Sequence, residues 1–169
     1  MRIEDLSSET VTQKYPRIAI NDSDERLYFI VGLFGFRQGQ AMADDWMRTY
    51  VTNYDGGLWD FWEIKSGYSA KTGPHITLTT STTGYISPPG DRTYNVCIPG
   101  HHFEAEMSAD AVGIIATLYV LNQLSWRTFD MGERYIELCR YLVEKQDSLM
   151  DYIDIVQHAE RELIYSAID

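Results

Sequence analysis

The amino-acid sequence predicts a single α+β domain, in which helices pack around a small, mostly antiparallel sheet. Near both ends of the chain, apolar residues recur at three- and four-residue steps, which is typical of amphipathic helices. Between these ends lie short segments rich in Tyr, Trp, Thr and Val, separated by Gly and Pro, which is typical of strands joined by turns. With 169 residues, 44% of them hydrophobic, the chain can bury one core of ordinary size, so we expect one domain over residues 1–169.

Two helices are expected in the first third of the chain. Asn21, Asp22 and Ser23 are all capping residue types, and they precede an apolar series in residues 24–33. A second helix is expected at residues 41–47, where Ala, Met and Trp residues are spaced to form an apolar stripe. The chain should then turn at residues 55–57.

The middle of the chain should supply the sheet. Residues 58–64 carry apolar side chains on both faces, so we expect a central strand there. A turn at Ser66 and Gly67 predicts that residues 68–71 return antiparallel to it as a hairpin. Further strands are expected at residues 75–80 and 93–98, on either side of a loop rich in Pro and Gly. The Thr and Ser residues of 77–83 fit either a strand or an exposed loop.

Helices are expected again from Ser108 onward. Ser108 is a good N-cap, and Asp110 would interact favourably with the positive end of the helix dipole. Nearly every side of residues 108–121 is apolar, so this should be a buried central helix. Two further helices are predicted at residues 133–145 and 149–167.

Composition and charge argue against several classes of protein. The longest apolar runs are far shorter than the roughly 20 residues of a membrane helix, and Arg2, Glu4 and Asp5 argue against a signal peptide. Two cysteines, Cys97 and Cys139, are too few for a disulfide framework and fit a reducing cytoplasm. A net charge of −11 argues against direct nucleic-acid binding, which requires a surplus of Lys and Arg.

One ordered array of acidic residues stands out near the C-terminus. Its members are expected to share one helical face at three- and four-residue steps: Asp147, Asp151, Asp154 and Glu162. Four carboxylates would then span about 22 Å of helix, a length over which duplex DNA carries about 13 phosphates. A solvated helix face is therefore the favoured interpretation, and a mimic of DNA is the alternative.

The segment from Tyr50 to Glu63 combines a Gly pair and three carboxylates with five aromatic residues. Asp55, Asp60 and Glu63 beside aromatic rings would suit a sugar site. Asp60 and Glu63, however, are three positions apart on the predicted strand, so their side chains should point to opposite faces and cannot form an acid–base pair. A carbohydrate-binding or hydrolytic domain remains a second alternative.

Motifs for other chemistry are absent from the sequence, which contains no glycine-rich phosphate loop, no GxSxG and no CxxC. His101, His102, Glu104 and Glu106 lack the spacing of a helical zinc motif, so a surface turn is favoured there over a metal site. Cys97 has no partnered base and is interpreted as a core residue.

Four segments in order carry a resemblance to a known family: NYDGGLWDFWE, SGYSA, CIPGHHFEAE and MSADAVGIIATLYVLNQLSW. Together they resemble the ArdB/KlcA family of antirestriction proteins, over nearly the whole chain. The resemblance implies a small α+β fold particular to the family and a non-enzymatic inhibitor without a cofactor, carried by plasmids and other mobile elements. It implies protection of incoming DNA from type I restriction-modification in a bacterial cytoplasm. The partner would be the restriction complex or a host factor that controls it. Residues 77–91 depart from the family pattern, being longer and richer in Thr.

The residues least explained by packing are our candidates for contact with that partner: Asp55, Asp60, Glu63 and Asp110. The structural alternatives are that Asp55 only forms its turn and that Asp110 only stabilises the start of its helix.

Overall fold

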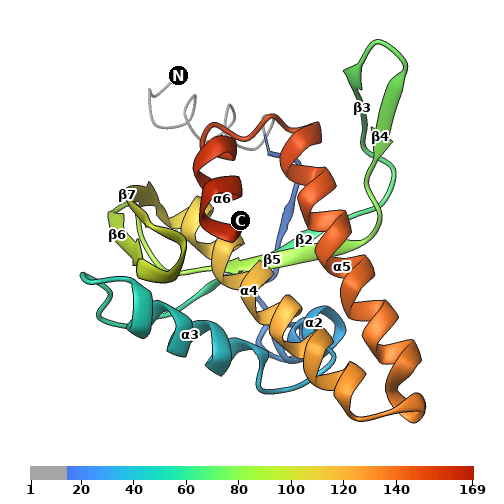
Figure 1. The fold of residues 1–169 in the computed structure, drawn as a ribbon, viewed down its shortest axis with the longest axis horizontal. Coiled ribbons are helices and arrows are strands. Elements are labelled where there is room, and N and C mark those ends of the chain that lie inside the picture. Colours follow the sequence, from blue (N-terminus) through green and yellow to red (C-terminus); the bar gives the residue numbers. More distant parts are fainter. Residues whose placement is uncertain (1–14) are drawn as a thin grey trace.

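The computed structural model describes residues 15–169 and confirms the α+β architecture (Figure 1). Arg2, Glu4 and Asp5, on which the signal-peptide expectation rests, lie outside these residues. A three-stranded antiparallel sheet has the order β1 (Ile18–Ala19), β2 (Asp60–Ile64), β5 (Thr83–Ser87). Two separate two-stranded sheets are formed by β3 (Ser69–Gly73) with β4 (Ile76–Thr79), and by β6 (Thr93–Ile98) with β7 (Phe103–Ser108).

Five α-helices surround these strands in the described part of the chain: α2 (Ser23–Phe34), α3 (Gly39–Tyr50), α4 (Ala109–Asp130), α5 (Ile136–Ile155) and α6 (Arg161–Ile168). Short 3-10 turns, η1 (Pro99–His101) and η2 (Glu133–Tyr135), precede β7 and α5. No helix among residues 15–169 combines the length and the apolar character that crossing a membrane would take.

The central helix expected after Ser108 is α4, which crosses the middle of the molecule between α3, α5, α6 and the sheet (Figure 1). The hydroxyl of Ser108 accepts a hydrogen bond from the backbone N–H of Ala111 (3.1 Å), which confirms the predicted cap. Ile114, Ile115 and Leu121 are fully buried. Thirteen residues of α4 are buried in all, so this helix supplies much of the core.

Two small features let β5 lie directly against α4. Gly113 has no side chain, and a Cβ there would lie 2.4 Å from the carbonyl oxygen of Ile86 and 2.5 Å from Cα of Ser87. One turn later, the hydroxyl of Thr117 accepts from the Ile86 N–H (3.2 Å) and donates to the Gly113 carbonyl (2.8 Å). Every residue of β5 is buried as a result.

The prediction of a central strand at residues 58–64 is confirmed, because β2 pairs with β1 on one side and with β5 on the other. The strand begins at Asp60, however, and Leu58 is 84% exposed. Gly56 and Gly57, within the predicted turn, have positive φ angles of 88° and 118°, a conformation that favours glycine.

The predicted hairpin between residues 58–64 and 68–71 is wrong. Residues 69–73 pair instead with β4, and this polar hairpin projects from the body of the molecule (Figure 1). Its strands offer few apolar side chains that could cover β2, whereas β5 brings Tyr85 and Ile86 to the core. Three strands were not expected: β1, just before α2; β5, which begins at Thr83, the last residue of the ambiguous Thr-rich stretch; and β7, where a surface turn was predicted.

The boundaries of the last two helices also differ from the prediction. A single helix, α5, continues to Ile155, and the chain then breaks before α6 begins at Arg161. Gln157 adopts a left-handed conformation with φ of 47°, which ends the helical path.

In the first third of the chain, both expected helices are confirmed. The Asp22 side chain caps α2 by accepting hydrogen bonds from the N–H groups of Asp24 (3.0 Å) and Glu25 (3.1 Å).

We expect Gly113→Ala to lower the free energy of unfolding by about 1–3 kcal/mol, because the added methyl group would meet backbone atoms that cannot move independently. Gly32→Ala is the matched control, since a Cβ at Gly32 meets nothing within 4 Å and lies inside α2. That change should raise stability by about 0.4–1 kcal/mol. Urea denaturation of the two variants checks both effects, and equal stabilities would contradict the close-packing explanation.

Candidate functional site

Asp110 lies at the centre of a polar cluster that joins four separate parts of the chain. Its Oδ1 accepts a hydrogen bond from the Tyr85 hydroxyl (2.7 Å) on β5, and it also pairs with Nη1 of Arg17, just before β1. Its Oδ2 lies 2.7 Å from Nε2 of His158, in the loop between α5 and α6. The Asp110 side chain is 20% exposed, so this carboxylate is held mainly by protein groups. We call these four residues the Asp110 cluster.

The hydrogen bonds of His158 determine its tautomer. Nδ1 accepts from the backbone N–H of Glu160 (3.0 Å), so the ring proton is carried by Nε2 and is donated to Asp110. The ring stacks on Tyr15 with centroids 4.7 Å apart and planes 13° from parallel. Both ring nitrogens are therefore engaged within the protein, and this His–Asp pair lacks the free nitrogen that a general base needs.

Arg17 closes the cluster on the side of the sheet. Its guanidinium carbon lies 3.7 Å from the centroid of a Trp62 ring, a cation–π arrangement, and Nη1 also donates to the Tyr85 hydroxyl. Burial alone would lower the pKa of Arg17, but Tyr85 and Asp110 outweigh it and raise that pKa. The charge of Arg17 is thus fixed in the cluster.

The cluster keeps Asp110 ionised. Burial alone would raise the pKa of Asp110, but the hydrogen bond from His158, the charge of Arg17 and the hydrogen bond from Tyr85 together lower it below its usual value. The opposite holds for Tyr85, whose pKa is raised well above its ordinary value by burial and by the neighbouring charge of Asp110. The stable state is a carboxylate that accepts from three donors.

A hollow of about 340 Å³, which we call the Asp110 pocket, opens beside the cluster. Asp60 and Asp110 both line it, together with Arg17, Asp91 and Arg92. Asp55 is connected to its rim, because Nη1 of Arg92 lies 3.1 Å from Oδ1 of Asp55. Three of the four candidate contact residues are therefore brought to one face of the protein.

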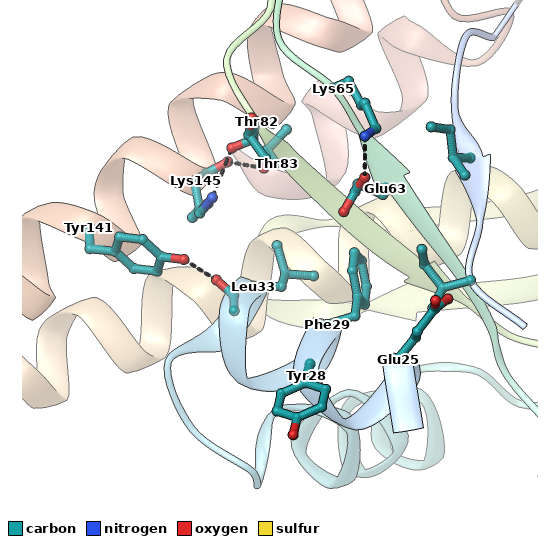
Figure 2. A pocket seen from close by; sticks show the side chains of 13 residues that line it. Glu25, Tyr28, Phe29, Leu33, Glu63, Lys65, Thr82, Thr83, Tyr141 and Lys145 are labelled. Atoms are coloured by element: carbon teal, nitrogen blue, oxygen red, sulfur yellow. Dashed lines mark hydrogen bonds and ion pairs between the residues drawn. The ribbon is translucent and has the colours of Figure 1, made fainter. Parts of the chain in front are cut away.

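Glu63, the fourth candidate, is directed elsewhere. It lines a different hollow, of about 540 Å³, between β2, α2 and α5, and lies 3.7 Å from Nζ of Lys65 (Figure 2). Lys145, on the same hollow, donates to the Thr82 carbonyl (2.9 Å), and its burial lowers its pKa. Asp60 and Glu63 share no pocket, as strand alternation predicted, so they do not form a glycosidase-like pair.

The predicted acidic face is not a face of one helix. Asp147, Asp151 and Asp154 lie on α5, whereas Glu162 lies on α6, beyond the break at residues 156–160. Asp154 accepts a hydrogen bond from the Tyr165 hydroxyl (2.6 Å), and burial together with the neighbouring aspartates raises the pKa of Asp151. A regular array of four carboxylates is thus replaced by three on one helix and one on the next.

The candidate metal ligands near His101 are spread over η1 and β7. Within residues 15–169, no group of three or more His, Cys, Asp or Glu side chains is placed to hold a metal ion. His101 lies in η1, and His102 follows with φ of 51°, while Glu104 and Glu106 lie on β7. Cys97 and Cys139 are free thiols and partly buried, so Cys97 lies less deep than the core position expected for it.

Sequence reasoning identified Asp110 but missed Arg17, Tyr85 and His158. These groups are separated from Asp110 by 93, 25 and 48 positions, so no local pattern connects them. A single His in a polar loop and an Arg beside a short strand carry no signal by themselves. Their meeting depends on how β5, α4 and the α5–α6 loop pack.

A family model of antirestriction proteins matches residues 52–169, well over half of the chain. The chain therefore belongs to the class of antirestriction proteins. The similarity extends to the antirestriction protein KlcA of Escherichia coli, 29% identical over 150 residues that cover 86% of this chain and 88% of KlcA. A second KlcA from Escherichia coli is 28% identical over 153 residues, covering 86% and 89%.

A solved structure supports the same relationship. The chain superimposes on it with a TM-score of 0.64 and 26% identity, over 91% of this chain and 96% of the other. That work describes the KlcA and ArdB proteins as having a novel fold and antirestriction activity against Type I DNA restriction systems in vivo but not in vitro. The protein belongs to the antirestriction family of the ArdB/KlcA type, and the expected family fold is confirmed.

We expect Asp110→Asn to lower the free energy of unfolding by about 3–5 kcal/mol at neutral pH, because it leaves the Arg17 charge without its carboxylate. Asp60→Asn makes the same change of charge at an exposed position and should alter stability by less than about 0.5 kcal/mol. Urea denaturation measures both variants. Equal stabilities of the two would show that the cluster contributes little.

The difference in stability between wild type and Asp110→Asn should also depend on pH. Because the pKa of Asp110 is lowered in the folded state, its contribution is complete above the unfolded value of about 3.9 and is lost as pH falls through the folded pKa. The stability gap between wild type and Asp110→Asn should therefore stay constant from about pH 7 to 5 and narrow below about pH 4. A gap that narrows already near pH 6 would contradict this assignment.

Proposed function

We propose that this protein relieves type I restriction of DNA that enters a bacterial cell, by a binding event without catalysis. The observation that carries the proposal is membership of the antirestriction family over residues 52–169. The fold it shares with KlcA and ArdB, which act against Type I DNA restriction systems, supports the same target system. We further propose that it works in the cytoplasm and is carried by a mobile element.

The binding mechanism is supported by the state of the Asp110 cluster. Both oxygens of Asp110 and both nitrogens of His158 are occupied by other protein groups. A catalytic pair needs a site that can take up or release a proton toward a substrate. The cluster instead has the features of a polar connection that holds the surface around the Asp110 pocket in place.

The partner is proposed to be the restriction complex or a host factor that controls it. KlcA and ArdB act in vivo but not in vitro, which favours a mechanism that needs a cellular component besides the purified restriction enzyme. Exposed carboxylates around the Asp110 pocket, Asp55 and Asp60, would contact Lys or Arg side chains of that partner. Glu63 is a separate candidate on the other hollow, and Asp110 would act by holding Arg17.

The test is the plating efficiency of unmodified phage on a host with a type I restriction system. Cells that express this protein should give more plaques than cells with an empty vector, and the difference should vanish in a host without the restriction system. Equal plating on the restricting host, with the protein present in soluble form, would overturn the proposal.

The contact residues are tested in the same assay with the double change Asp55→Asn and Asp60→Asn. We expect protection to fall by about tenfold or more, as for a loss of at least 1.4 kcal/mol of binding free energy. Glu104→Gln together with Glu133→Gln removes the same charge from exposed positions outside the Asp110 pocket and should leave protection unchanged. Matching unfolding curves for all variants exclude a stability effect. If both pairs behave alike, the Asp110 pocket is not the contact surface.

Copurification distinguishes the two partners. The tagged protein from a restricting host should retain either restriction subunits or a different host protein. The Asp55, Asp60 double variant should retain less of it than the Glu104, Glu133 double variant.

A further inference from the structure

A third hollow, of about 630 Å³, lies between α3 and α4 and shares no residue with the Asp110 pocket. We call it the α3–α4 groove. The two helices lie side by side across the lower half of the molecule (Figure 1). Every residue that lines the groove belongs to one of these helices, so its walls are two helical faces.

Aromatic side chains form the base of the groove. The ring of Trp46 lies 5.4 Å from those of Tyr50 and Tyr119, and its side chain is only 7% exposed. The Trp46 indole N–H is buried without a hydrogen-bond acceptor among the described residues, a state that costs about 1–3 kcal/mol in a folded protein.

Trp126 forms an exposed wall of the groove. It is 62% exposed, and it contacts Phe129, which is 60% exposed, edge to face at a centroid distance of 6.1 Å. Met131, 49% exposed, follows at the end of α4. Trp126 is the last residue of the segment MSADAVGIIATLYVLNQLSW, yet core packing does not account for it. A contiguous exposed aromatic surface of this kind is typical of protein-binding sites.

The dimensions of the groove suit a short helix. Its lining runs from Met42 to Tyr50 on α3 and from Tyr119 to Asp130 on α4, which correspond to about 12 and 16 Å at a rise of 1.5 Å per residue. Two to three turns of a bound helix would fill this length. A bound strand is disfavoured because no strand edge among the described residues opens into the groove to pair with it.

The charges at the rim favour a basic occupant. Asp45 on α3 and Asp130 on α4 line the groove, and neither forms an ion pair with a described residue; Arg48, near Asp45, is bonded to Asp44 instead. Asp130 is also the last residue of α4, where the helix dipole adds negative potential. Arg127 is the single cation on the lining, and the whole chain carries a net charge of −11.

We propose that the α3–α4 groove binds a short, basic amphipathic helix of a protein partner. The apolar face of that helix packs on Trp46 and Trp126, and its Lys or Arg side chains approach Asp45 and Asp130. For its role in the cell this inference rests on the proposed antirestriction function, since the groove would then hold part of the restriction complex or of its controlling factor. The binding itself is a property of the purified protein.

The experiment uses a capped peptide of about 12 residues, with leucines at i, i+3, i+4 and i+7 and lysines on the remaining face. Trp126 is the most exposed of the four tryptophans, so binding should shift the emission of the wild-type protein to shorter wavelength. Calorimetric titration should show that Trp126→Ala weakens binding at least about tenfold. The double change Asp45→Asn and Asp130→Asn should weaken it about three- to tenfold and reduce its salt dependence.

Matched controls separate groove binding from general attraction between a basic peptide and an acidic protein. Tyr28→Ala removes an aromatic side chain that is 78% exposed on α2, outside the groove, and should leave affinity unchanged. A scrambled peptide of the same composition should bind at least about tenfold more weakly. The proposal is overturned if the scrambled peptide binds equally well, or if Trp126→Ala and Tyr28→Ala bind like wild type.

Failure here is distinguishable from failure of the antirestriction proposal. If the protein protects phage DNA but does not bind the peptide through Trp126, the proposed function stands and the groove proposal is rejected. If the protein binds the peptide through Trp126 but gives no protection, the groove stands as a binding site and its proposed role in antirestriction is rejected.

Discussion

The Asp110 carboxylate is the constraint on which the arrangement of this protein depends. It accepts from Arg17 before β1, Tyr85 on β5 and His158 after α5, while lying itself in the first turn of α4. A buried charge is tolerated only where such partners compensate for the loss of water. Because each partner comes from a different element, the cluster fixes the sheet, the central helix and the α5–α6 loop relative to one another.

The packing of β5 on α4 makes this cluster possible. Gly113 and Thr117 allow the strand to lie against the helix, and the Tyr85 hydroxyl then reaches Asp110 from within the core. At its first residue β5 is also tied to α5, because the Thr83 hydroxyl donates to the Lys145 carbonyl (2.8 Å). The strand β5, which was not predicted from the sequence, therefore connects the core to the Asp110 cluster.

Local signals predicted the parts of this fold that local interactions determine. A cap among residues 21–23, the Ser108 cap, the buried character of α4 and the central position of β2 all follow from residues within one element. The partner of β3, the existence of β1, β5 and β7, and the break at Gln157 depend on what the chain meets elsewhere. For the site, Asp110 could be singled out from its helix position, but Arg17, Tyr85 and His158 are recruited by tertiary packing, which no spacing in the sequence records.

Polar groups that already have partners and polar groups that are free to bind lie in different parts of the described structure. In the Asp110 cluster every oxygen of the carboxylate and every nitrogen of the imidazole already has a partner, so a ligand would have to break existing bonds to engage them. Asp60 at the pocket mouth, and Asp45 and Asp130 beside Trp126, have no ion pair with a described residue to break. Binding energy is gained most readily where groups are still solvated and apolar area is still exposed. The cluster therefore joins elements of the fold, and the surfaces beside it are those that we propose for a basic partner.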